Sequence, residues 1–383
     1  MSGTAILFED DNIKVCFEQG ETEYLLVSFG FMNFIAKNSL DYCGKPPIVN
    51  NNISSISITA KHNHWYPYQY LEPASKIIFN KLKEYSKVIN YGVSMGGYAA
   101  LKYSKLFNAD KVIAIEPQWS INPRDIDDTR YIDFFKKNKI FLERMSIREN
   151  DISGQCYLIY DPFNPIDNEH AKNILEQYNR NNINIIHTYF SGHRLGTILA
   201  GSDFFGNLLS MIDCESNLLD VKKIIRKKRK SHVWHYKEVI GCILRHNHQS
   251  LLFKLVKNLR DDNEFFYNPV FSPERKRLIK HINFSSINKN QALIFLDKIP
   301  EIHNKQMIKD ILNCNKTITT WIQSAFGNFL VFDMLKSQLI LADGQQIAEN
   351  VFIRPLSFEG DFGILGLEIN GNFMPLVNDL RGG

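Results

Sequence analysis

The sequence lacks the features of a membrane-spanning, disulfide-rich or zinc-binding protein. It has no run of about 18 apolar residues, so we expect no transmembrane helix. Its six cysteines include no C-x-x-C pair, which argues against a zinc site and against a dense disulfide framework. The first residues contain no basic stretch and are acidic by position 9, so we expect no signal peptide and a cytoplasmic protein with reduced thiols.

Excess charge of one sign is also missing. The net charge of +4 is small for 383 residues and does not suggest a nucleic-acid-binding protein. No cluster of His, Cys, Asp and Glu has the spacing of a metal site, so we predict no metal. What remains is ordinary for a globular protein, with 44% apolar and 22% charged residues and enough length for two or three domains.

Short apolar runs alternate with helical patterns over residues 1–218. Two β-rich runs at the N-terminus resemble a hairpin, and several later runs are apolar on both faces, as buried parallel strands are. The strand candidates after the hairpin are 23–29, 55–60, 87–92, 111–116, 156–161 and 183–190. The helical candidates are 73–86, 95–106, 129–145, 168–181 and 194–213. This alternation predicts an α/β fold with a doubly wound, mostly parallel sheet in a catalytic domain over 1–218.

The composition changes after residue 218. Five consecutive basic residues, Arg226 to Lys230, mark a basic linker at 219–231. This stretch is either a solvated linker or a contact for an anionic polymer or a membrane surface. Residues 232–314 show an amphipathic helical period, and 315–383 resemble a small β-rich unit.

Gly92, Ser94 and Gly96 form a G-x-S-x-G pattern within "VINYGVSMGGYAALKYS" at residues 88–104. An apolar strand ends before the pattern, and a helix-forming run follows it. Strand, turn and helix are the context of a nucleophile elbow, in which a strained turn exposes the serine Oγ at the end of the sheet. We therefore predict that Ser94 is a nucleophile.

A serine nucleophile needs a base and an acid, which follow it in that fold in the order Ser, acid, His. His193 comes just after the last predicted strand and before a helix, so it is the expected base. Asp161 and Asp167 are both candidates for the acid, which fixes the imidazole tautomer. Asp161 stands at a strand end and is the favoured choice, whereas Asp167 also fits a helix N-cap.

Backbone N–H groups are expected to bind the oxyanion of the tetrahedral intermediate. One should belong to Met95, directly after the nucleophile. The other should come from the loop after the strand at 23–29, where Gly30 and Phe31 are the candidates.

Together these residues resemble the α/β-hydrolase superfamily over about residues 4–213. Four stretches, "YGVSMGGYAAL", "EPQWSINPRDIDDTRY", "YDPFNPIDNEHA" and "SGHRLG", further resemble hydrolase-like proteins of bacterial capsule and exopolysaccharide clusters. Some relatives of that type are polysaccharide O-acetyltransferases with a Ser-His-Asp triad. The resemblance implies a carbohydrate or polysaccharide substrate, no tightly bound cofactor, and acetyl-CoA as acyl donor if the protein is a transferase.

The resemblance also draws attention to Trp65, Tyr66 and Gln118, which follow strands at the carboxyl edge of the sheet, where ligands bind in open α/β folds. The two aromatic residues either stack on a sugar or acyl donor or pack in the core. Gln118 either binds substrate or makes a buried polar contact.

Two function classes remain open. The favoured one is a serine acyl-ester enzyme, an esterase if water is the second acceptor and an O-acetyltransferase if a sugar hydroxyl is. The alternative is a non-catalytic binding or scaffold protein on a hydrolase fold, with partner-binding modules after residue 231. The intact Ser94, His193 and acid candidates favour the enzyme.

Overall fold

The computed structural model describes residues 3–178, 182–246 and 248–257, a few helical positions between 272 and 298, and the backbone of five strands between 329 and 376. The chain divides into two compact units, residues 1–238 and 239–383. Among the described residues, no helix is long and apolar enough to cross a membrane.

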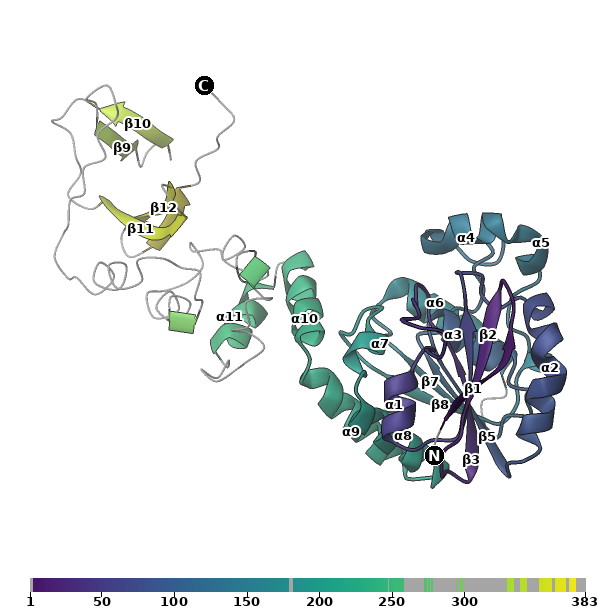
Figure 1. The fold of residues 1–383 in the computed structure, drawn as a ribbon. Coiled ribbons are helices and arrows are strands. Elements are labelled where there is room, and N and C mark those ends of the chain that lie inside the picture. Colours follow the sequence, from purple (N-terminus) through teal and green to yellow (C-terminus); the bar gives the residue numbers. More distant parts are fainter. Residues whose placement is uncertain are drawn as a thin grey trace. The chain divides into compact units, whose positions relative to one another are not determined.

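An eight-stranded sheet forms the centre of the first unit (Figure 1). Its strands are β1 (Thr4–Glu9), β2 (Ile13–Glu18), β3 (Tyr24–Phe29), β4 (Ser55–Ala60), β5 (Lys87–Val93), β6 (Lys111–Ile115), β7 (Gln155–Tyr160) and β8 (Ile183–His187). Their spatial order is β1-β2-β4-β3-β5-β6-β7-β8. The β1–β2 hairpin is antiparallel and joins β4 antiparallel, whereas all pairs from β4 to β8 are parallel. The predicted hairpin and mostly parallel sheet are confirmed.

Helices cover both faces of this sheet (Figure 1). They are α1 (Lys45–Asn50), α2 (Tyr68–Leu82), α3 (Met95–Lys102), α4 (Ile132–Lys137), α5 (Lys139–Leu142), α6 (Pro165–Gln177), α7 (Leu195–Ile198), α8 (Ser202–Asp213) and α9 (Leu218–Lys230). Short 3₁₀ turns occupy Thr129–Tyr131 and Glu149–Asp151. Helices α10 (Val233–Arg245) and α11 (Gln249–Lys257) follow along the chain.

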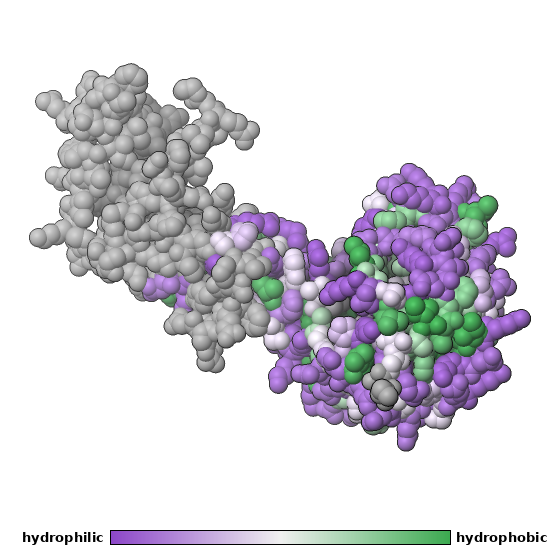
Figure 2. Space-filling view, viewed as in Figure 1, coloured by the Kyte–Doolittle hydropathy of each residue, from purple (hydrophilic) through white to green (hydrophobic). Residues whose placement is uncertain are grey.

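Alternate side chains of each strand enter two separate apolar cores, one on each face of the sheet. On β3, Leu25 and Val27 pack with residues of α2, α3 and α6, whereas Leu26 packs with residues of α1, α8 and α9. Burying each such side chain stabilises the fold by about 1.5–3 kcal/mol. The outer face of this unit in Figure 2 is mostly hydrophilic, with smaller hydrophobic patches. Because both faces of the sheet are covered by apolar side chains, polar groups can gather at the ends of the strands.

The predicted basic linker at 219–231 forms helix α9 instead. Asn217 caps the helix by accepting a hydrogen bond from the Leu219 N–H at 2.9 Å. Val221 and Ile225, one turn apart, are buried in the core shared with α8. The lysines and arginines around these two residues hide the apolar stripe in the sequence. The first unit extends to residue 238, past the predicted boundary at 218.

The second unit contains five described strands. β9 (Phe329–Asp333) and β10 (Gln338–Ala342) form an antiparallel pair. β11 (Val351–Glu359), β12 (Phe362–Ile369) and β13 (Asn372–Leu376) form an antiparallel three-stranded sheet. Most of the predicted helical segment 232–314 lies outside the described residues.

Candidate active site

Ser94 occupies a strained turn between β5 and α3. Its backbone has φ 52° and ψ −117°, a conformation that costs a non-glycine residue on the order of 1–3 kcal/mol. The Ser94 N–H donates to the Ile115 carbonyl at 2.8 Å, which ties the turn to the next strand. A Cβ on Gly92 would lie 2.0 Å from the Gly96 carbonyl oxygen, and a Cβ on Gly96 would lie 2.3 Å from that of Phe29. Only glycine fits at both positions, so the pattern has the steric basis of a nucleophile elbow.

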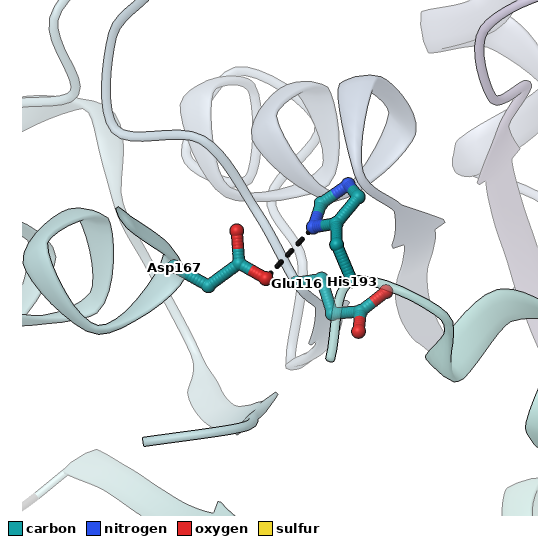
Figure 3. Close-up of side chains that lie close together, drawn as sticks. All are labelled: Glu116, Asp167 and His193. Atoms are coloured by element: carbon teal, nitrogen blue, oxygen red, sulfur yellow. Dashed lines mark hydrogen bonds and ion pairs between the residues drawn. The ribbon is translucent and has the colours of Figure 1, made fainter. Parts of the chain in front are cut away.

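His193 and Asp167 complete a hydrogen-bonded chain with this serine. Ser94 Oγ lies 3.1 Å from His193 Nε2, and His193 Nδ1 lies 2.8 Å from an Asp167 carboxylate oxygen. Figure 3 shows the Asp167 carboxylate directed at the ring. The His193 side chain is 25% exposed and the Asp167 side chain only 2%, so the imidazole is accessible from solvent while the carboxylate behind it is enclosed.

The carboxylate beside His193 therefore belongs to Asp167 and not to the favoured Asp161. Asp167 lies in the first turn of α6, whose N-cap is Asn164. Asp161 faces the loop before His193, where one of its oxygens accepts the N–H groups of Ser191 and Gly192, both at 2.8 Å. Its other oxygen accepts the Phe163 N–H at 2.9 Å. The turn that begins at Asp161 carries the chain to Asp167, and position at a strand end alone does not reveal this.

A buried ionic network holds the second oxygen of Asp167. Both terminal nitrogens of Arg130 lie 3.1 Å from it. Arg130 also donates to both oxygens of Asp128, which lies 3.0 Å from His170 Nε2. Burial opposes ionisation of Asp128, but the hydrogen bonds from His170 and Arg130 outweigh it and hold its pKa well below its ordinary value. Arg130 thus turns the free oxygen of Asp167 toward His193.

Two side chains besides the histidine contact the Ser94 hydroxyl. Gln118 Nε2 donates to Ser94 Oγ at 3.1 Å. Tyr131 also hydrogen-bonds Ser94, and burial raises the pKa of this phenol. Trp65 Nε1 donates to Gln118 Oε1 at 3.1 Å, which fixes the amide with its nitrogen toward the serine.

Trp65 and Tyr66 do not offer rings to a substrate in this structure. Both are fully buried, with positive φ values of 52° and 49°. The Trp65 ring packs on Tyr131 with centroids 4.8 Å apart. The Tyr66 hydroxyl donates to the Gly30 carbonyl at 2.8 Å. The structure supports the packing alternative for both aromatics, and of the three residues only Gln118 contacts the site.

Met95 is the strongest of the three oxyanion-hole candidates. It is the first residue of α3, ahead of the first intrahelical bond from the Tyr98 N–H to the Ser94 carbonyl at 2.9 Å. Gly30 uses its N–H in the sheet, donating to Ile58 at 2.9 Å. The Phe31 backbone hydrogen-bonds the buried Cys43 thiol, whose pKa burial raises to about 11. Both loop amides therefore have other partners in this structure.

Glu116 is a third carboxyl group beside the imidazole that the sequence patterns did not reveal. It directly follows β6, has φ 47° and is 2% exposed. Both of its oxygens lie 3.0 Å from the Leu195 N–H. Burial, and then the charge of Asp167, raises its pKa well above the ordinary value. Arg130 and Tyr131 were also missed, although "EPQWSINPRDIDDTRY" contains Glu116 and both of them.

Glu116, Asp167 and His193 are the one group among the described residues able to offer three ligand atoms to a metal ion, all within 4.8 Å of one another. In this structure the imidazole Nδ1 is paired with Asp167 (Figure 3), and Glu116 accepts from the Leu195 N–H. The donor set is thus already satisfied by protein groups, which fits a hydrogen-bonded relay better than a metal centre.

No family model and no curated protein matches the sequence. Among solved structures, the chain is similar to the capsule O-acetyltransferase of Neisseria meningitidis serogroup A, with 11% identity over 54% of this chain and 93% of the other, and a TM-score of 0.39. It is also similar to acetyl xylan esterase 1 from a Thermoanaerobacterium species, with 14% identity over 56% and 88% and a TM-score of 0.37.

A third similar structure is the 2,6-dihydroxy-pseudo-oxynicotine hydrolase, with 12% identity over 58% of this chain and 67% of the other, and a TM-score of 0.39. The strand order, the antiparallel N-terminal hairpin and the serine elbow after β5 are independent of these scores. On those features, the unit of residues 1–238 has the fold of the α/β-hydrolases.

Proposed function

We propose that the protein is a serine acyl-ester enzyme that acts on O-acyl groups of a carbohydrate or polysaccharide, as an esterase or an O-acetyltransferase. The observation that carries the proposal is the relay from Ser94 through His193 to Asp167, with a hydrogen bond at each step. A hydroxyl is a weak nucleophile, and an adjacent base oriented by an acid is what activates it.

The first half-reaction follows from this geometry. Ser94 Oγ attacks the acyl carbonyl carbon while His193 Nε2 takes the hydroxyl proton. The Met95 N–H and the α3 N-terminus stabilise the oxyanion. His193 then gives the proton to the leaving oxygen, or to the sulfur if the donor is acetyl-CoA. The acyl group remains on Ser94.

In the second half-reaction His193 deprotonates the acceptor. Water as acceptor releases the free acid, and a sugar hydroxyl gives a new ester. Gln118 and Tyr131 hold Ser94 Oγ from the sides not occupied by the imidazole. They restrain the serine rotamer, so the nucleophile is aligned before substrate arrives.

A cavity of about 420 Å³ is a candidate for the site that holds the rest of the substrate, although neither Ser94 nor His193 lines it. It lies at the edge of the sheet where β3 and β4 end, and α4 borders it. Its lining includes the amides of Asn33, Asn63 and Asn138 and the rings of Phe34 and Phe134. Asn33 and Asn63 hydrogen-bond each other and Asn138 donates to the Phe134 carbonyl, so a sugar would bind here by exchanging these contacts for its hydroxyls and by packing on the aromatic faces.

Hydrolysis of p-nitrophenyl acetate by the full chain and by Ser94→Ala, with and without a glycan acceptor, tests the proposal. We expect the variant to lose turnover and the acceptor to decide between acetate release and acetyl transfer. Acetyl-CoA serves as a second donor. Equal inertness of both proteins with every donor would favour the non-catalytic binding protein instead.

A further inference from the structure

Three carboxyl groups surround the short segment that carries His193. They come from three different places in the chain: Glu116 follows β6, Asp161 follows β7 and Asp167 lies in α6. Only Asp167 bonds the imidazole itself. The other two bond the backbone on either side of the histidine, which raises the question of what they contribute.

Asp161 holds the backbone before His193. A single oxygen accepts the N–H groups of Ser191 and Gly192, both at 2.8 Å. Gly192 has φ 56°, so the chain turns sharply there, one residue before the histidine. A loop with a left-handed residue has other accessible conformations, and two hydrogen bonds to one oxygen select this one.

Glu116 holds the backbone after His193. Its oxygens accept the Leu195 N–H at the first turn of α7, and the Arg194 N–H also bonds this carboxyl group. A helix of four residues has little stability of its own, so the contact to Glu116 is needed to fix where it begins. In Figure 3 the Glu116 carboxyl group lies beside the backbone of His193.

We propose that Asp161 and Glu116 are positioning residues that clamp the His193 backbone from both sides and so hold Nε2 within reach of Ser94 Oγ. The expected effect on kcat rests on the proposed function. The expected effect on the position of the His193 ring does not. It also gives Asp161, the acid favoured from the sequence, a role distinct from that of Asp167.

The charge state of Glu116 gives it a different effect on His193 from that of Asp167. Asp167, Asp161 and His193 all face this buried carboxyl group. Burial, and then the charge of Asp167, raise the pKa of Glu116 and outweigh the Leu195 and Arg194 N–H bonds, which lower it. A neutral Glu116 supports the backbone without placing a second negative charge beside the imidazole, so Asp167 alone sets the electrostatics of the ring.

Variants at Glu116 test this assignment in the full chain. Glu116→Gln preserves the size and the acceptor of a protonated glutamate, so kcat should stay within about threefold of wild type with an unchanged pH profile. Glu116→Ala removes the support, and kcat should fall about 10- to 100-fold with little change in KM, because the nucleophile and base lose alignment. If Glu116→Gln keeps the kcat that Glu116→Ala loses, a neutral hydrogen-bond acceptor at position 116 is sufficient and a negative charge is not required.

Glu18 offers a matched control. It is a buried glutamate that accepts hydrogen bonds from Thr4 and Tyr42 and lies opposite Ser55, at the start of β4 and thus at the other edge of the sheet from Ser94. Glu18→Ala should lower the melting temperature but leave kcat unchanged. If Glu116→Gln is as inactive as Glu116→Ala, or if both keep wild-type kcat, the Glu116 assignment is wrong.

Asp161→Ala and Asp161→Asn provide the second test. In asparagine one oxygen can still accept the Ser191 and Gly192 N–H groups, but the amide nitrogen then faces the Phe163 N–H. We expect a partial kcat loss for asparagine and a larger loss for alanine, about 10- to 100-fold. Wild-type kcat in Asp161→Ala would overturn its role.

The ¹⁵N and ¹H NMR signals of the His193 ring give a readout that does not need turnover. The Nδ1–H signal should broaden or shift in Glu116→Ala and Asp161→Ala and stay in place in Glu116→Gln and Glu18→Ala. If Ser94→Ala leaves turnover unchanged, the proposed function fails, and the NMR comparison still decides whether the two carboxyl groups clamp His193. Unaltered ring signals in both alanine variants would refute the clamp.

Discussion

At the scale of single residues, Asp167 separates the two candidate acids. Asp167→Asn keeps the size of the side chain but no longer offers His193 Nδ1 a negative charge, so it favours the wrong tautomer. We expect kcat to fall on the order of 10³- to 10⁴-fold with KM little changed. Steady-state kinetics on p-nitrophenyl acetate measure this, and a loss in Asp161→Asn that equals or exceeds it would contradict the assignment.

Arg130 gives a second prediction at this scale. Arg130→Gln removes the guanidinium that contacts the second oxygen of Asp167 and both oxygens of Asp128. Asp167 is then no longer held in place behind the imidazole, so kcat should fall about 10- to 100-fold with little change in KM. Steady-state kinetics on p-nitrophenyl acetate check this, and wild-type kcat in the variant would show that Arg130 does not act through Asp167.

The pairing of Ser94 with His193 was predictable because each residue combines its type with a strand boundary. Ser94 lies between glycines that only a close strand–helix approach explains, and His193 lies just past the last strand. The carboxylate beside the imidazole was not predictable, since Asp161 and Asp167 both lie near a strand end and only the path of the intervening turn distinguishes them. Trp65 was misleading for a related reason, because sequence position cannot show that its indole is turned into the core onto Gln118.

At the scale of elements, strands were easier to predict than helices. Apolar runs buried on both faces gave β3 to β8 within a few residues at either end. The predicted helix at 129–145 instead breaks into a 3₁₀ turn, α4 and α5. Asp128 caps the 3₁₀ turn through its side chain, and Asn138 ends α4 and begins α5. The basic run obscured helix α9, because the apolar residues that pack in the core, such as Val221 and Ile225, lie between lysines and arginines.

Helix α9 carries the next prediction. Lys223, Arg226, Lys227 and Lys230 are exposed at positions that share one face, and Asp220 pairs with Lys223. We propose that this face contacts an anionic polymer. The triple variant Arg226→Glu/Lys227→Glu/Lys230→Glu should weaken retention on an anionic polysaccharide column at least tenfold at low salt while turnover of p-nitrophenyl acetate stays unchanged. Equal retention would assign the face to solvent only.

At the scale of the whole molecule, the first unit depends on residues beyond the predicted boundary. Arg229 in α9 donates to the Tyr189 carbonyl, and His235 Nδ1 lies 3.1 Å from the Phe190 carbonyl. The Arg194 guanidinium lies 4.6 Å from the Trp234 ring centroid. These contacts surround the loop that carries His193. Helix α9 and the start of α10 therefore support the site from outside the sheet.

Truncation tests this support. A chain ending at residue 218 loses α9 and should be less stable and lose most turnover, whereas one ending at residue 246 keeps these contacts. Circular dichroism melting and p-nitrophenyl acetate kinetics on both fragments compare them. Equal activity of the two fragments would show that the loop holds its conformation without α9.

Acid sensitivity of the fold follows from His64. It is fully buried, accepts the Tyr66 N–H at Nδ1 at 2.9 Å, and burial lowers its pKa to about 4. Because the folded pKa lies below the unfolded value of about 6.5, its contribution is complete above pH 6.5 and is lost as the pH falls toward 4. The loss amounts to about 3 kcal/mol at most.

Urea unfolding at pH 7.5 and pH 5 measures this loss. His64→Gln keeps an acceptor for Tyr66 and cannot titrate, so the difference in unfolding free energy between the two pH values should shrink. His235, whose pKa burial also lowers to about 4, will leave part of the dependence in place. An identical pH difference in wild type and variant would rule out His64 as a source.

The backbone of Ser94 has a consequence for how this protein can change. Its dihedral angles are ones that glycine adopts freely and serine does not. The residue on which turnover is proposed to depend therefore lowers the stability of the folded protein through its backbone conformation. A screen that rewards thermal tolerance alone would enrich Ser94→Gly, a protein that is more robust and inert. Improvement by laboratory evolution thus has to select for activity in every round.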